Sequence, residues 1–297
     1  MKKTICLLSI IISGVFLLTS CGNKEQTQDD TKDVVEQDTV KAGIVNIGGQ
    51  LFSIPSPIQT AMLIQKLGIP FNKSLLLPAN KIASFNNDAV RSLMLGVYGA
   101  DLGYVSMFAQ TQEALGYLAS IKQLSDKLGV SAAFNEQTLK RLQNNITNKD
   151  SLVSLVGIAY RASDSYLKTN KRLDISSLIL VGGWIESMHF SAQTYKAKNN
   201  NEVKLRLAEQ KQATDNIIQL LTLNAPDQTE LIGLLKELQT LYGKVEYKYT
   251  FVEPVTDTAK KITTINSTNE IKVDDATLNA IIEKIEAIRN KITNPTS

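Results

Sequence analysis

Glu186 and His189 have the residue types and spacing of an acid–base pair. They are three positions apart, so they share one face if residues 175–198 form a helix. A carboxylate beside an imidazole can exchange protons with a substrate near neutral pH. His189 is the only histidine in the sequence, so any chemistry that needs an imidazole depends on it.

Three more polar residues interrupt apolar stretches, namely Asp101, Tyr104 and Arg161. A buried carboxylate must be paired, hydrogen-bonded or neutral, and Arg161 is the partner we expect for Asp101 or Glu186. The interpretation we favour is an internal network that stabilises the fold. The alternative is a ligand-binding cleft formed by Asp101, Tyr104, Arg161, Glu186 and His189.

Other kinds of chemistry lack their motifs. The sequence contains no G-x-x-x-x-G-K-[ST], no G-x-G-x-x-G after a strand and no G-x-S-x-G. A single histidine also excludes the usual zinc sites, and no calcium loop of the EF-hand type is present. We therefore expect no metal and no cofactor, and we assign no catalytic residue.

The elements that must position these residues are helices. Apolar residues recur at helical spacing from residue 57 onward, with long helices over 150–170, 175–198 and 202–223. The first half of the helix over 175–198 is apolar nearly all round, which is typical of a buried helix. We predict an all-α fold, either an irregular multi-helix bundle or a helical-hairpin array, with at most a small β-hairpin near 43–54 or 245–273.

Gly96, Gly99 and Gly103 interrupt the helical pattern ahead of Tyr104. Their spacing places them on one helical face, where another backbone can come close. We favour close helix packing or a kink at this place. A ligand pocket is the alternative.

The N-terminus has a different pattern. Lys2 and Lys3 precede an apolar run over 5–18, and Leu18-Thr19-Ser20-Cys21 follows. A charged start, an apolar run and small residues before the cleavage position are features of a secretory signal peptide. The apolar run is shorter than the roughly 20 residues that a membrane-spanning helix needs, which disfavours a retained transmembrane anchor.

Leu18-Thr19-Ser20-Cys21 resembles the lipobox of bacterial lipoproteins. The resemblance implies cleavage before Cys21, diacylation of Cys21 and acylation of the new N-terminus. In enterobacterial lipoproteins an Asp after the lipidated Cys marks retention in the inner membrane, so Gly22 favours the outer membrane. Cys6 would leave with the signal peptide, and the mature domain would then have no thiol for a disulfide or a metal.

We predict three regions: a lipoprotein signal peptide over 1–20, a flexible acidic tether over 21–42 and a single α-helical domain over 43–297. The tether is too polar to offset the entropy of ordering it. Two smaller domains after the tether are the alternative. The formal net charge of +3 is too weak to indicate a nucleic-acid partner.

These observations predict a membrane-anchored lipoprotein of the bacterial cell envelope that acts as a non-enzymatic binding or interaction module. Its partners would be the lipid bilayer, through acylated Cys21, and an envelope protein. The alternative is a small-ligand-binding protein or an acid–base enzyme with a pocket near Asp101, Glu186 and His189.

Overall fold

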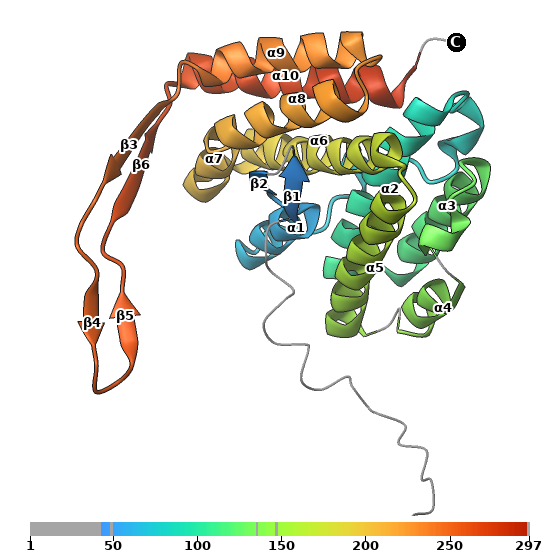
Figure 1. Cartoon of the computed structure of the whole chain (residues 1–297), viewed down its shortest axis with the longest axis horizontal. Coiled ribbons are helices and arrows are strands. Elements are labelled where there is room, and N and C mark those ends of the chain that lie inside the picture. The colour runs from blue at the N-terminus through green and yellow to red at the C-terminus, as the bar shows by residue number, and fades with distance from the viewer. Residues whose placement is uncertain (1–42, 48–49, 135, 146–147, 296–297) are drawn as a thin grey trace, which may run out of the picture. The chain divides into compact units, whose positions relative to one another are not determined.

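The computed structural model describes residues 43–47, 50–134, 136–145 and 148–295. The signal peptide and the tether, predicted over 1–20 and 21–42, lie outside these ranges. Within them the all-α prediction is confirmed (Figure 1). The α-helices are α1 (Pro57–Lys66), α2 (Asp88–Met107), α3 (Thr111–Lys127), α4 (Glu136–Asn144), α5 (Lys149–Thr169), α6 (Leu173–Lys198), α7 (Asn201–Ala208), α8 (Lys211–Asn224), α9 (Thr229–Tyr242) and α10 (Asp275–Thr293).

Strands occur in both stretches where a hairpin was predicted. The first pair is β1 (Gly43–Ile47) with β2 (Gln50–Ile54), in antiparallel register. The second stretch holds two antiparallel pairs along one long hairpin (Figure 1). Its strands are β3 (Glu246–Thr250), β4 (Val255–Asp257), β5 (Ile262–Thr264) and β6 (Thr268–Lys272), where β3 pairs with β6 and β4 with β5. Three short 3₁₀ turns, η1 (Lys73–Leu75), η2 (Lys81–Ser84) and η3 (Ser131–Phe134), complete the regular structure.

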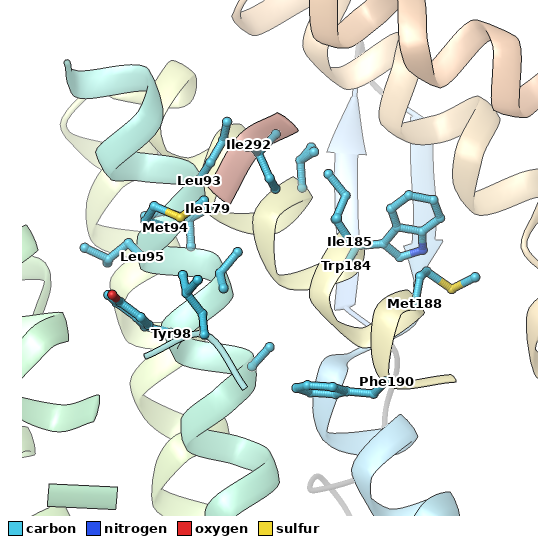
Figure 2. Close-up of a cluster of buried hydrophobic side chains, with 14 of the residues drawn as sticks. Leu93, Met94, Leu95, Tyr98, Ile179, Trp184, Ile185, Met188, Phe190 and Ile292 are labelled. Carbon is cyan, nitrogen blue, oxygen red and sulfur yellow. The ribbon is translucent and has the colours of Figure 1, made fainter. Parts of the chain in front are cut away.

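The core is organised around α6, which is buried over most of its length, as its apolar sequence predicts. It packs against α1 and α2 and also against α8 and α10 (Figure 1). Large side chains such as Trp184 and Phe190 fill the space between these helices (Figure 2). A helix that is apolar all round is stable only when neighbours cover every side of it.

Glycines bring α2 and α6 into backbone contact. A Cβ atom on Gly96 would lie 1.9 Å from the Ile179 carbonyl oxygen, and one on Gly182 would lie 2.0 Å from the Leu93 carbonyl oxygen. α2 continues through its glycines without a break. The glycines of α2 therefore serve close helix packing, as we favoured from the sequence. Buried side chains flank the contact between the two helices (Figure 2).

The single helix predicted over 202–223 is divided into α7 and α8. The Leu207 carbonyl accepts a hydrogen bond from the Tyr242 hydroxyl at 2.9 Å, and the Ala208 carbonyl accepts one from the Tyr247 hydroxyl. Gln210, between the two helices, accepts a hydrogen bond from the Trp184 indole at 3.1 Å. These contacts supply partners to the carbonyls that a continuous helix would have paired internally.

Candidate functional site

Glu186 of α6 pairs with Arg289 of α10. Both guanidinium contacts, from Nε to Oε2 and from Nη2 to Oε1, are 2.9 Å. Glu186 is fully buried and the Arg289 side chain is 13% exposed. A bidentate pair of this kind satisfies both carboxylate oxygens and fixes the orientation of both side chains.

One turn further along α6, His189 also faces α10. Its Nδ1 lies 2.8 Å from Glu286 Oε1, and its Nε2 lies 3.1 Å from the Leu75 carbonyl oxygen. Rising numbers on α6 thus meet falling numbers on α10, so the two helices are antiparallel here. Burial opposes ionisation of Glu286, but the hydrogen bond and charge of His189 outweigh it and lower the pKa of that carboxyl.

Asp101 of α2 is wholly buried beside this network. Burial, followed by the charge of Glu186, raises the pKa of Asp101 well above its ordinary value. Arg289 and the Leu77 N–H oppose this shift but are weaker. Neither Asp101 oxygen has a partner at hydrogen-bonding geometry, so the Leu77 N–H and Glu186 are only close neighbours. A neutral Asp101 explains how two carboxyl groups can share this buried place.

Among the described residues, the other two predicted ones, Arg161 and Tyr104, form no hydrogen bond or ion pair with Asp101, Glu186 or His189. Arg161 is exposed on α5, so the pairing expected between Arg161 and Asp101 or Glu186 is wrong. The cation is Arg289 instead. Tyr104 is fully buried, with its ring centroid 4.9 Å from that of Phe190, and its hydroxyl accepts a hydrogen bond from the Asn72 N–H at 3.2 Å.

These polar side chains converge on one stretch of backbone, residues 72–79, which we call the buried segment after the three buried leucines at its centre; residues 72–74 and 78 are exposed. Apart from η1 it has no helix or strand, and Leu75, Leu76 and Leu77 are buried. The Leu75 carbonyl accepts from both His189 and Arg289, at 3.1 and 3.3 Å. Buried backbone groups outside regular structure need partners from side chains, and here the predicted His189 and the unpredicted Arg289 supply them to the Leu75 carbonyl.

Further hydroxyls from α2 and α3 hold the rest of the buried segment. The Tyr117 hydroxyl donates to the Leu77 carbonyl at 2.8 Å, and the Tyr98 hydroxyl donates to the Pro78 carbonyl at 3.0 Å. Burial raises the pKa of both phenols above the ordinary value, which keeps them protonated as donors. Ser120 completes the set by donating to the Ala79 carbonyl at 2.7 Å.

Glu286 and Arg289 were not among the residues predicted for the site. A signal for Arg289 was present, because it follows the buried Ile285 by four residues and Ile282 by seven. It therefore lies on the apolar stripe of α10, where a charge must be paired. The stripe does not reveal which helix carries the partner.

A cavity of about 30 Å³ lies between α2, α3, α4, α5 and α6. Apolar residues such as Leu95, Leu139 and Ile179 dominate its lining, which also includes Gly99 and Tyr160. Ligand pockets usually measure roughly 300–1,000 Å³, so this space is too small for a metabolite.

Two further features are absent from the described residues. In these ranges no cluster of three or more His, Cys, Asp or Glu side chains is arranged to hold a metal ion. Across the same part of the chain, no helix is both long and apolar enough to cross a membrane. Comparison with known protein families, with curated proteins and with solved structures finds no match.

Proposed function

We propose that the protein is a lipid-anchored lipoprotein of a bacterial cell envelope, placed in the outer membrane, that acts as a non-enzymatic binding module. The anchor rests on the resemblance of Leu18-Thr19-Ser20-Cys21 to a lipobox. The non-enzymatic role rests on one observation, the engagement of His189 and Arg289 with the Leu75 carbonyl. Side chains that satisfy buried backbone groups are not free to bind a substrate.

The acid–base alternative finds less support in this geometry. Glu186 has both oxygens paired with Arg289, and both nitrogens of His189 face acceptors. A general acid or base must reach the proton that it transfers, and these two groups are directed at partners within the fold.

The anchor is tested by growing a bacterium that expresses the full chain with an alkyne-bearing fatty acid and separating its membranes. We expect label on the wild-type protein, in the outer-membrane fraction, and none on a Cys21→Ser variant. Label that persists in Cys21→Ser, or a wild-type chain without label, would contradict the proposal.

The binding role is tested in the same cells by crosslinking the anchored protein. We expect one discrete product with an envelope protein, lost when the two proteins are made in separate cells and mixed after lysis. Absence of any crosslinked product across several crosslinker lengths would count against a binding module.

A further inference from the structure

Exposed apolar side chains gather on one element, the long hairpin over 246–272. Seven of the twelve large hydrophobic residues that are exposed in the described part of the chain lie on it. Tyr249, Phe251 and Val255 are each 62% exposed, and Ile265 is 73% exposed. Contiguous exposed apolar side chains mark a surface that something else covers.

Each ladder of the hairpin carries its large apolar side chains on one face. In β3–β6, Tyr247 pairs with Ile271, while Lys248 pairs with Glu270 on the opposite face. In β4–β5, Val255 and Ile262 share one face with their register partners Thr264 and Asp257, and Thr256 and Thr263 form the other face. A two-stranded ribbon is marginally stable in water unless something packs on its apolar face.

The protein itself covers only the base of this ribbon. The Tyr247 hydroxyl donates to the Ala208 carbonyl at the end of α7, and β6 contacts the same helix. Beyond that point the exposures of Tyr249, Phe251, Val255 and Ile265 show that no described residue covers them. The unpartnered apolar surface is therefore the distal part of the hairpin.

We propose that the apolar face of the hairpin over 246–272 inserts into the interfacial region of the bilayer in which Cys21 is anchored. This rests on the lipid anchor of the proposed function. Cys21 lies 22 residues before Gly43, and an extended chain of that length spans about 75 Å. The anchor thus keeps the folded domain within reach of the membrane surface.

The contacts at the start of the domain agree with this occupant. β2 packs on α8 and β6 packs on α7, and these two helices follow one another with two residues between them. Two consecutive helices, α7 and α8, thus hold the base of the hairpin and the β1–β2 pair with which the described domain begins (Figure 1). Tyrosine is also enriched at the membrane–water interface, and phenylalanine is typical of the apolar face of segments that lie in it.

The charges of the hairpin favour a bilayer over a charged partner. Its four lysines and four acidic residues cancel, and at its tip Lys260 lies 3.3 Å from Asp257. A neutral ribbon with an apolar face binds through buried area, with little dependence on the sign of the lipid headgroup. Antiparallel pairing with a second copy, centred on Lys248 or Glu270, would oppose like charges and is disfavoured.

The test measures the depth of an indole placed on the hairpin. The full-length lipidated protein carrying Phe251→Trp is reconstituted into vesicles of phosphatidylethanolamine and phosphatidylglycerol with brominated acyl chains. Trp184, the native indole, is 1% exposed and contributes a constant background. Leu223→Trp, at a position of α8 that is 55% exposed, is the matched control.

We expect brominated lipid to quench the Phe251→Trp indole several-fold more than the Leu223→Trp indole, and aqueous iodide to do the reverse. Adding Ile262→Ser and Ile265→Ser to this variant should restore quenching of the indole at position 251 by aqueous iodide. Equal iodide access in the two variants would overturn the proposal. So would protection that appears only in native membranes, because a protein would then be the occupant.

The mass of the Cys21 peptide is measured on the same preparation, so failure of the anchor is scored separately from failure of the hairpin. If Cys21 carries no lipid, the proposed function fails. Insertion is then judged from the same quenching experiment with the unlipidated chain added to preformed vesicles.

Discussion

The charge state of Asp101 depends on whether the chain is folded. In the folded protein its carboxyl is fully buried beside Glu186, and its pKa is raised well above the ordinary 3.8. The folded state therefore keeps a proton that the unfolded chain releases. The stabilising effect of this proton is complete below about pH 4 and is lost as the pH rises toward the raised pKa.

Replacing Asp101 by Asn should remove this pH dependence, because an amide stays neutral throughout. Relative to wild type, Asp101→Asn should gain stability from pH 4 to pH 8, by up to about 1.4 kcal/mol for each pH unit. The measurement is urea unfolding at several pH values, followed by circular dichroism.

Asp126→Asn is the control for this series. Hydrogen bonds from Lys122 and Ser131 lower the pKa of Asp126. Its titration therefore changes the stability only at pH values below about 4. Its stability difference from wild type should stay flat between pH 4 and pH 8. An equally flat difference for Asp101→Asn would show that Asp101 is ionised in the folded protein.

At the level of elements, the contact between α2 and α6 has no room for a side chain. A Cβ atom on Gly96 would meet the backbone of α6 at 1.9 Å, and backbone cannot rotate away as a side chain can. The two helices would have to separate, which would loosen the packing around Leu93 and Ile179 (Figure 2).

Gly96→Ala should therefore destabilise the protein by roughly 1–3 kcal/mol or more, the usual cost of overpacking. Gly233→Ala in α9 is the matched control, since nothing lies within 4 Å of its added Cβ. That control should stabilise the protein by about 0.5–1 kcal/mol. Urea midpoints of the two variants are compared, and a shift in the same direction would contradict the close contact.

Periodicity predicted the elements well where burial follows a helical period. The apolar surround of the first half of α6 indicated that this helix is buried. The division between α7 and α8 could not be predicted, because Tyr242 and Tyr247 reach back to it from distant elements.

The candidate site was predicted in part, for a physical reason. Polar residues within apolar stretches pointed to Asp101, Glu186 and His189, which lie in one network. Arg161 and Arg289 both follow apolar helical positions, and only the packing of α10 on α6 decides between them. The buried segment has neither helical nor strand periodicity. Its burial, and therefore the need of its backbone for side-chain hydrogen bonds, could not be predicted from the sequence.

Considered as a whole, the molecule is tied together across the buried segment. Side chains from α2, α3, α6 and α10 hold its backbone, and Arg289 reaches Leu75 across 214 residues of sequence. The polar groups thus join the N-terminal third of the domain to its last helix. The acylated Cys21 and the hairpin over 246–272 are the two parts that we propose contact the bilayer.

The measurement that tests the structural role of this network most directly is the free energy of unfolding of Arg289→Met. The variant leaves Glu186 buried without its cation, so we predict a loss of about 3–5 kcal/mol. Lys284→Met is the control, because Lys284 pairs with the exposed Glu237 at 2.5 Å. Its loss should stay under about 1 kcal/mol. If Arg289→Met costs no more than this control, Glu186 is open to water, and the network is a site rather than a support.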